Sequence, residues 1–206
     1  MHIAVDGAAG VGKSTVAKRL AERLNILYVN TGAMYRALAW GLERGLTLDE
    51  VQLHLDDAGE LWVNGQAVTH VLYSAQLDRA ASGLAKKPEV RKKLIALQQA
   101  IASDRDVVME GRDIGVVVLP QADLKLYLTA SLEERARRRS LERGQSVDEV
   151  LQAIRDRDAR DEGHGRHPAA DAVWLNTDGL SAEEVVEQAL TCLKKTVRGG
   201  RIQGRL

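Results

Sequence analysis

The chain has 206 residues, 45% of them hydrophobic, which is enough for the core of one α/β domain. Its 29 Lys and Arg balance 29 Asp and Glu, and only 3% of residues are aromatic, which counts against a nucleic-acid binder. The single cysteine, Cys192, excludes an intrachain disulfide. We find no transmembrane run and no signal-peptide pattern, and we therefore expect no membrane partner and a cytoplasmic location.

The first part of the chain alternates between strands and helices. We expect a strand over His2–Asp6, then a glycine-rich turn and a helix from Lys13 with an apolar side chain every fourth residue. A second strand over Ile26–Val29 and a helix from about Ala33 to Arg44 follow. Strand, glycine-rich turn and helix in this order are typical of the start of a nucleotide-binding α/β unit.

The next segment, from Leu46 to Lys87, is more polar and less regular. Asn64-Gly65 stands between the short runs Glu60–Val63 and Gln66–Val68, which predicts a two-residue β-hairpin. Helical pieces surround this hairpin. We therefore expect an inserted subdomain here instead of another strand–helix–strand repeat.

After this insert the alternation resumes. Pro88 can begin a helix that runs to about Ser103. Predicted strands then lie at 107–110, 125–128 and 172–175. One helix is predicted at 131–143. Two more are predicted to begin at the capping boxes that start with Ser146 and with Ser181. The pattern predicts an α/β fold, with a doubly wound parallel sheet between helices, and residues 198–206 form a predicted frayed tail.

The segment after the first strand fits the phosphate-loop pattern G-x-x-x-x-G-K-[ST]. Backbone N–H groups of such a loop surround a diphosphate, the lysine neutralises the terminal phosphates, and the serine hydroxyl holds Mg²⁺. The loop alone does not distinguish a kinase from a GTPase, a motor or a transporter ATPase. The residues predicted to bind ATP are Gly7, Ala8, Ala9, Gly10, Val11, Gly12, Lys13, Ser14 and Thr15, with Ser14 as the metal ligand.

Three further motifs carry hydroxyl and charged groups. Residues 30–36, NTGAMYR, combine a hydroxyl, a glycine and an arginine where the second strand ends, which suits an acceptor phosphate. Residues 110–115, EGRDIG, follow a buried strand, so their polar groups project over the same edge of the sheet. Residues 157–161 read RDARD. Each motif also has a purely structural explanation. The first could be a capped helix, the second a structural ion pair and the third a solvated charge run.

Taken together, the chain resembles the bacterial cytidylate kinase family of P-loop nucleoside monophosphate kinases. The resemblance rests on DGAAGVGKST, NTGAMYR, ASGLAKKPEVR, EGRDIG, RDARD and LNTDGLSAEEV, which follow one another in the family's order along nearly the whole chain. It implies a monomeric P-loop kinase that uses ATP and Mg²⁺ to phosphorylate CMP or dCMP. It also implies a monophosphate-binding subdomain over about 37–93 and a lid over about 138–166.

The resemblance further implies individual roles. The catalytic charges would be Lys13, Arg36, Arg112 and Arg157. The acceptor would be bound by Thr31, Arg36, Ser82, Arg91, Arg112, Asp113, Arg157 and Asp161, with Ser82, Arg91 and Asp113 reading cytosine and Thr177 to Gly179 near adenine. Two positions depart from the family pattern. Val116 stands where many members have Thr. His164 stands where longer members have an arginine, and it stays open whether Arg166 takes the place of that arginine.

Other functions stay open at this point. The chain could be a P-loop kinase for another small acceptor, such as UMP, shikimate or dephospho-coenzyme A. It could be a non-catalytic ATP-binding regulator, although that gives no reason for arginines to converge on one crevice. A nucleic-acid-handling ATPase is disfavoured by the zero net charge and the few aromatic residues.

Overall fold

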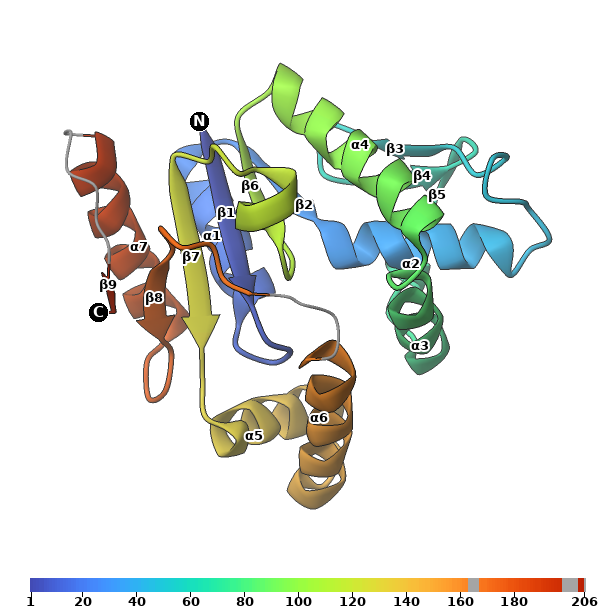
Figure 1. The fold of residues 1–206 in the computed structure, drawn as a ribbon. Helices are drawn as coiled ribbons and strands as arrows, with labels where there is room; N and C mark the ends of the chain where they lie inside the picture. Colours follow the sequence, from blue (N-terminus) through green and yellow to red (C-terminus); the bar gives the residue numbers. More distant parts are fainter. Residues whose placement is uncertain (163–166, 198–203, 206) are drawn as a thin grey trace.

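A computed structural model of the chain describes residues 1–162, 167–197 and 204–205, and a parallel sheet lies at its centre (Figure 1). The strand order is β2-β6-β1-β7-β8-β9. All five pairings are parallel, so the carboxyl ends of the strands meet at one edge. The strands are β1 (His2–Gly7), β2 (Leu27–Asn30), β6 (Val107–Glu110), β7 (Leu124–Thr129), β8 (Val173–Asn176) and β9 (Gly204–Arg205).

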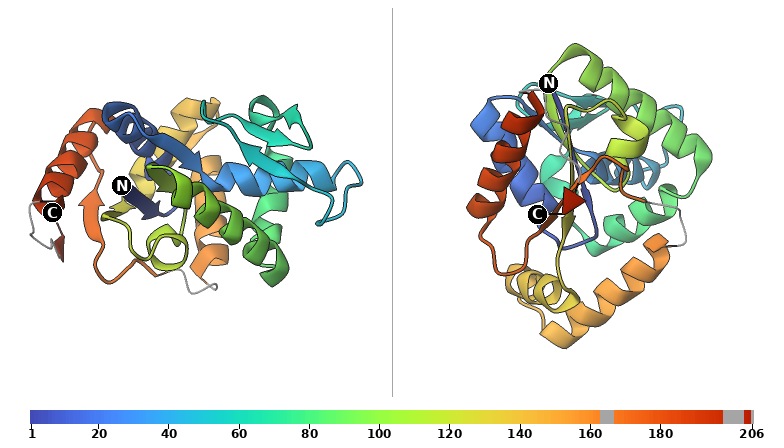
Figure 2. Two further views of the ribbon diagram at one scale, coloured as in Figure 1. Left: turned by 90° about the horizontal axis from the view of Figure 1, so that it is seen from above. Right: turned by 60° about the vertical axis from the view of Figure 1, so that its left-hand side comes forward.

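Helices cover both faces of this sheet, which confirms the predicted doubly wound α/β class. Helices α1 (Lys13–Leu24) and α7 (Ala182–Val197) lie together on one face (Figure 2). On the other face lie a π-helical segment, η2 (Ile114–Val118), and α4 (Pro88–Asp104). The two faces carry separate hydrophobic clusters, because the side chains of a parallel strand alternate between them.

The central insert, residues 46–87, lies between α2 (Thr31–Leu42) and α4 in the chain, and all three share one hydrophobic cluster with strands of the sheet. The insert contains an antiparallel sheet of β3 (Leu53–Leu55), β4 (Leu61–Val63) and β5 (Gln66–Ala67), then η1 (Thr69–Val71) and α3 (Ala75–Leu84). The predicted hairpin turn forms, with left-handed φ angles of 47° at Asn64 and 81° at Gly65. The boundaries predicted for the subdomain, 37–93, remain a prediction.

Helix α2 begins two residues before the predicted start at Ala33. The side chain of Asn30 caps it by accepting a hydrogen bond from the Ala33 backbone N–H at 2.8 Å. This cap brings Thr31 and Gly32 into the first turn, although neither is a strong helix former. The acceptor motif therefore lies on the helix itself.

Beyond the carboxyl end of β7, the helices α5 (Leu132–Arg143) and α6 (Val147–Glu162) form a hairpin (Figure 1). The hairpin has its own small core of Ala136, Val150 and Ile154. Ser146 caps α6 by accepting from the Glu149 backbone N–H at 3.3 Å, in line with the predicted capping box. Within the described ranges, no helix has the length and apolar character needed to cross a membrane.

Candidate active site

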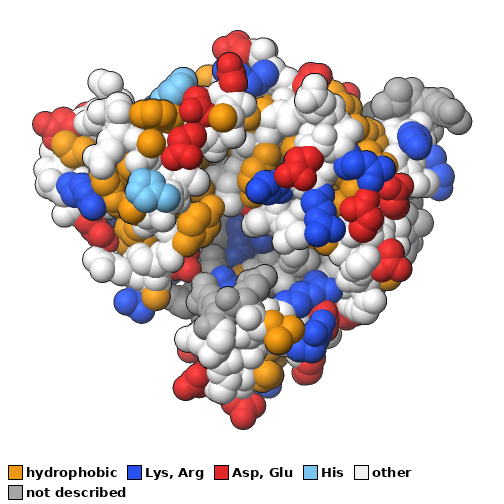
Figure 3. Space-filling model, turned by 180° about the vertical axis from the view of Figure 1, so that it is seen from behind, with side chains coloured by type: hydrophobic (Ala, Val, Ile, Leu, Met, Phe, Trp, Pro, Cys, Tyr) orange, Lys and Arg blue, Asp and Glu red, His pale blue; other side chains and the backbone are white. Residues whose placement is uncertain are grey.

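A cleft of about 1740 Å³ runs along the carboxyl edge of the sheet, between the phosphate loop and the insert. Figure 3 shows it as a hollow with Lys and Arg side chains on its walls. The cleft brings together residues predicted for both the donor and the acceptor side. Those on its walls include Lys13, Ser14, Thr15, Thr31, Arg36, Ser82, Arg91, Arg112 and Asp113.

The phosphate loop joins β1 to α1 and packs tightly against β7. At Gly7, with φ of 146°, an added Cβ would lie 2.3 Å from the Leu128 carbonyl oxygen, so only glycine fits. Lys13 folds back over the loop, and its Nζ donates to the Ala8 carbonyl at 2.7 Å. The first N–H groups of α1 lie at the end of this loop, where a helix attracts anions.

Arg36 reaches the cleft from α2. Its Nη1 lies 3.5 Å from Oδ1 of Asp78, and its guanidinium carbon lies 5.0 Å from the centroid of the Tyr73 ring. The Arg36 Nε is buried and has no hydrogen-bond partner within the described residues. The cationic head is thus held between a carboxylate and an aromatic face at the cleft wall.

Arg91 of α4 and Asp113 form a close ion pair on the same wall. The Arg91 Nη2 donates to Oδ2 of Asp113 at 2.7 Å. Burial by itself would lower the pKa of Arg91, but the hydrogen bond and the charge of Asp113 outweigh it and raise that pKa. Ser82, on α3, donates its hydroxyl to the Asp78 carbonyl at 2.9 Å. All three residues predicted to read the base line the cleft, and two of them, Arg91 and Asp113, are in direct contact.

The EGRDIG segment is held in place by Asp6, a residue that the sequence analysis did not assign to the site. Its buried carboxylate, at the end of β1, accepts from the backbone N–H groups of Ile114 and Gly115 at 2.9 and 2.8 Å. Burial raises the pKa of Asp6, while these two hydrogen bonds oppose the shift. The central strand thereby fixes the turn that presents Arg112 and Asp113.

A polar cluster around Tyr28 also lies in the cleft and was not predicted. The Tyr28 hydroxyl donates to Oε1 of Glu110 at 2.7 Å and accepts from Nδ2 of Asn30 at 3.2 Å. Ser14 lines the same cleft. Burial is the main cause of a strong rise in the pKa of Tyr28. The Thr31 hydroxyl donates to the backbone carbonyl of Glu110 at 2.8 Å, which joins the acceptor motif to β6.

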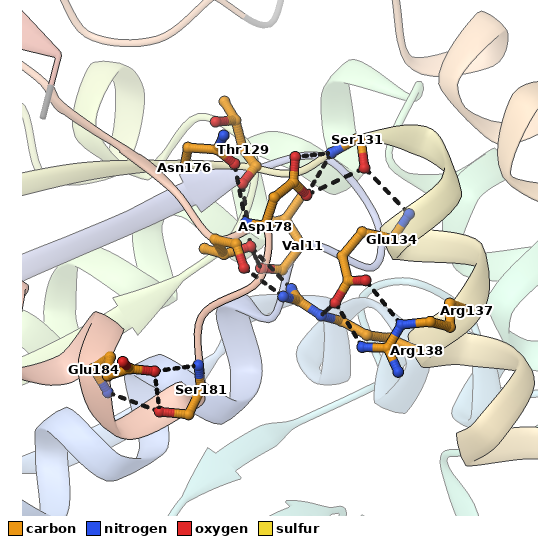
Figure 4. Close-up of polar contacts among 11 residues, drawn as sticks. Val11, Thr129, Ser131, Glu134, Arg137, Arg138, Asn176, Asp178, Ser181 and Glu184 are labelled. Carbon is orange, nitrogen blue, oxygen red and sulfur yellow. Dashed lines mark hydrogen bonds and ion pairs between the residues drawn. The ribbon is translucent and has the colours of Figure 1, made fainter.

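A smaller cavity of about 350 Å³ lies on the other side of the phosphate loop, and Arg138 and Thr177 line it. Figure 4 shows Arg138 reaching from α5 to the loop after β8. Its Nη1 donates to the Thr177 hydroxyl at 2.9 Å, and its Nε donates to Glu134 at 2.7 Å. Hydrogen bonds and charge from Arg137 and Arg138 lower the pKa of Glu134 to about 2. The predicted adenine segment, 177–179, begins at this cavity.

Arg135 connects the α5–α6 hairpin to the phosphate loop. Its Nη1 lies 2.6 Å from Oδ2 of Asp158 on α6 and donates to the Ala9 carbonyl at 3.3 Å. Asp158 belongs to the RDARD motif, so this motif is placed beside the loop. The side chains of Arg157 and Asp161, and residues His164 and Arg166, lie outside the described residues, and their roles remain predictions.

Comparison with known proteins agrees with this arrangement. A sequence model described as cytidylate kinase matches residues 3–195. A cytidylate kinase of Desulfitobacterium hafniense is 42% identical over 226 residues, covering 100% of this chain and 97% of the relative. A cytidylate kinase from Pelotomaculum thermopropionicum is 44% identical over 209 residues, covering 90% of this chain and 92% of the relative. A solved gluconokinase structure from Sinorhizobium meliloti, at 17% identity, has a TM-score of 0.53 over 96% of this chain and 93% of that chain, a likeness in fold alone.

Proposed function

This chain belongs to the cytidylate kinase family, and we propose that it transfers the γ-phosphoryl group of ATP to the phosphate of CMP or dCMP. The products are ADP and the corresponding diphosphate. One observation carries the proposal: a single cleft joins a phosphate loop to Arg36 and to the Arg91–Asp113 pair. The loop suits the donor phosphates, while the arginine and the ion pair suit an acceptor that has both a phosphate and a base.

Both substrates are polyanions, and the transition state spreads negative charge over the moving phosphoryl group. Catalysis is therefore positioning plus stabilisation by cations, without a covalent intermediate. Lys13, Arg36 and Arg112 line the cleft and supply positive charge there. The acceptor phosphate is already an anion, so the reaction needs no strong general base. We assign Arg157, on α6, to the same charge cluster from the family resemblance.

The base is selected by hydrogen-bond polarity. Cytosine has an amino donor at N4 and acceptors at N3 and O2. Asp113 can accept from N4, while Arg91 and Ser82 can donate to N3 or O2. Uracil places an acceptor, O4, against the carboxylate and a donor, N3–H, against the arginine. Each unpaired buried group costs roughly 1–3 kcal/mol, so two give discrimination on the order of a thousandfold.

The oxygen ligands around the phosphate loop fit Mg²⁺, a hard cation. Ser14 is exposed and lines the cleft, and Glu110 lines the same cleft. No group of three or more His, Cys, Asp or Glu in the described part of the chain could hold a metal by itself. That fits a cation carried mainly by the nucleotide's phosphates, with Ser14 as the protein ligand. Bound there, Mg²⁺ would neutralise phosphate charge.

The α5–α6 hairpin is our candidate for the lid. It lies beyond the carboxyl end of β7 and contacts the phosphate loop through Arg135. Closure over the cleft would exclude water, which competes with CMP for the phosphoryl group. We further propose that the enzyme is a cytoplasmic monomer.

A panel of acceptors tests the function. Purified protein is mixed with ATP, Mg²⁺ and CMP, dCMP, UMP, AMP, shikimate or dephospho-coenzyme A, and ADP formation is measured. We expect turnover with CMP or dCMP far above that with the others. Preference for another acceptor would refute the assignment, and tight ATP binding without any turnover would instead indicate a non-catalytic nucleotide-binding protein.

A further inference from the structure

Helix α4 has a glutamine at a position on its core face where an apolar side chain is expected. The buried side chains of this helix follow one another four residues apart, at Val90, Leu94, Gln98 and Ala102, which is the spacing of a single helix face. The other three are apolar and belong to the hydrophobic cluster on that side of the sheet. Gln98 is only 1% exposed. The helix therefore buries an amide where a leucine would continue its apolar face.

The amide of Gln98 has a donor atom without a partner. Its Nε2 is buried and forms no hydrogen bond within the described residues. A buried donor of this kind destabilises a fold, so each instance calls for a physical explanation. Gln98 also lines the cleft, and so does Arg36, whose Nε is another buried atom without a partner in the described part of the chain. A ligand in the cleft is therefore able to supply the acceptor that Gln98 lacks.

The cleft wall that α4 and η2 form suits a planar base better than a phosphate. Ile95 of α4, and Ile114 and Val118 of η2, line the cleft together with Gln98. The two elements meet next to Gln98, because the Gln99 side chain donates to the Val118 carbonyl at 3.3 Å. A phosphate needs cations, whereas apolar side chains around an uncharged amide favour a flat ring with a few polar atoms.

The position of Gln98 along α4 relates it to the pair predicted to read the base. Arg91 precedes it by about two turns, and the side chains of a helix lean toward its N-terminus. Gln98 thus leans toward the part of α4 where Arg91 meets Asp113. Cytosine has room for a further donor, since its O2 has two lone pairs in addition to the acceptor N3. Resting on the proposed function, we propose that Gln98 binds the base of the acceptor nucleotide, with Nε2 donating to N3 or O2.

Gln98→Met tests this role, because it removes the amide and keeps an unbranched side chain that adapts to its surroundings. Binding of CMP and, separately, of ADP to the full chain is measured by calorimetry. We expect CMP to bind about tenfold more weakly, because one of its acceptors loses its partner, while ADP binds as it does to the parent protein. The melting temperature of the ligand-free variant is expected at or above the parent value, because a costly buried donor has been removed.

Gln99→Met is the matched control, because Gln99 is the next residue in the chain but is exposed and does not line the cleft. This control keeps the parent affinity for CMP. Unchanged CMP binding in Gln98→Met, or an equal loss for CMP and ADP, would overturn the proposal. A lower melting temperature of the ligand-free variant would also overturn it, since the amide would then serve the fold itself. Failure of the parent protein to bind CMP would instead refute the proposed function, and this inference with it.

Discussion

Replacing Asp113 by asparagine tests the residue on which the choice of base depends. In the structure, Oδ2 of Asp113 accepts from Arg91 at 2.7 Å, and the Asp113 side chain is only 18% exposed. Asparagine is nearly the same size as aspartate, so the fold is kept. The amide, however, loses the charge that holds Arg91, and it can turn its NH₂ group toward the base. Both changes weaken recognition of cytosine.

The magnitude follows from this contact. A hydrogen bond to a charged group is worth roughly 1.5–3 kcal/mol, or about tenfold to 150-fold in kcat/KM. We expect a loss of this size for CMP. The flipped amide can donate to O4 of uracil, so kcat/KM for UMP stays near its low parent value. The ratio of CMP to UMP activity therefore narrows by roughly tenfold or more.

The assay is steady-state ADP release with each acceptor at saturating ATP, together with the KM for ATP. Glu187→Gln is the matched control. Glu187 also forms an ion pair with an arginine, Arg23, at 2.7 Å, but Glu187 lies on α7 and does not line the cleft. That control keeps the parent ratio. If Asp113→Asn retains the CMP-to-UMP ratio while folding normally, Asp113 does not read the base and our account of specificity is wrong.

Three other predictions concern the acceptor, the lid and acid stability. Arg36→Ala raises the KM for CMP about tenfold or more and leaves that for ATP nearly unchanged, because its charge faces the acceptor side; an equal effect on both would place Arg36 elsewhere. CMP plus a non-hydrolysable ATP analogue protects the amides of residues 138–162 from hydrogen exchange more than either ligand alone, and unchanged exchange there would exclude this hairpin as the lid. Glu134 has a folded pKa of about 2 against 4.5 for the free carboxyl, so its contribution to stability is complete above pH 4.5 and is lost as the pH falls toward 2. The melting temperature, measured between pH 2 and 5, falls with this loss of stability. In Glu134→Gln the melting temperature depends less on pH over this range. An unchanged pH dependence in that variant would contradict the pairing of Glu134 with the two arginines.

Local patterns predicted most of the sheet and its helices. The strand at 107–110 and the hairpin at Asn64-Gly65 agree with the structure because each depends on residues adjacent in the chain. The strand β3 was missed, since three residues between polar neighbours give no usable period. The π-helical segment η2 was also missed, because its first turn is held by Asp6, which lies far away in the sequence.

The same reasoning applies to the candidate site. Parallel strands end at one edge, so motifs that follow β1, β2 and β6 could be expected to share a cleft. The partners within that cleft could not be predicted in this way. Tyr28 with Glu110, and Arg36 with Tyr73, are brought together only by the packing of distant elements, and no spacing in the sequence indicates them.

Arg135 has a consequence for engineering this enzyme. Its Cβ lies 3.3 Å from where a Cβ on Gly10 would stand, while its guanidinium joins Ala9 to Asp158. The α5–α6 hairpin is therefore not an independent cassette. A chimera that receives this hairpin from a relative will fit only if the incoming segment keeps an arginine at position 135 and a glycine faces it at position 10.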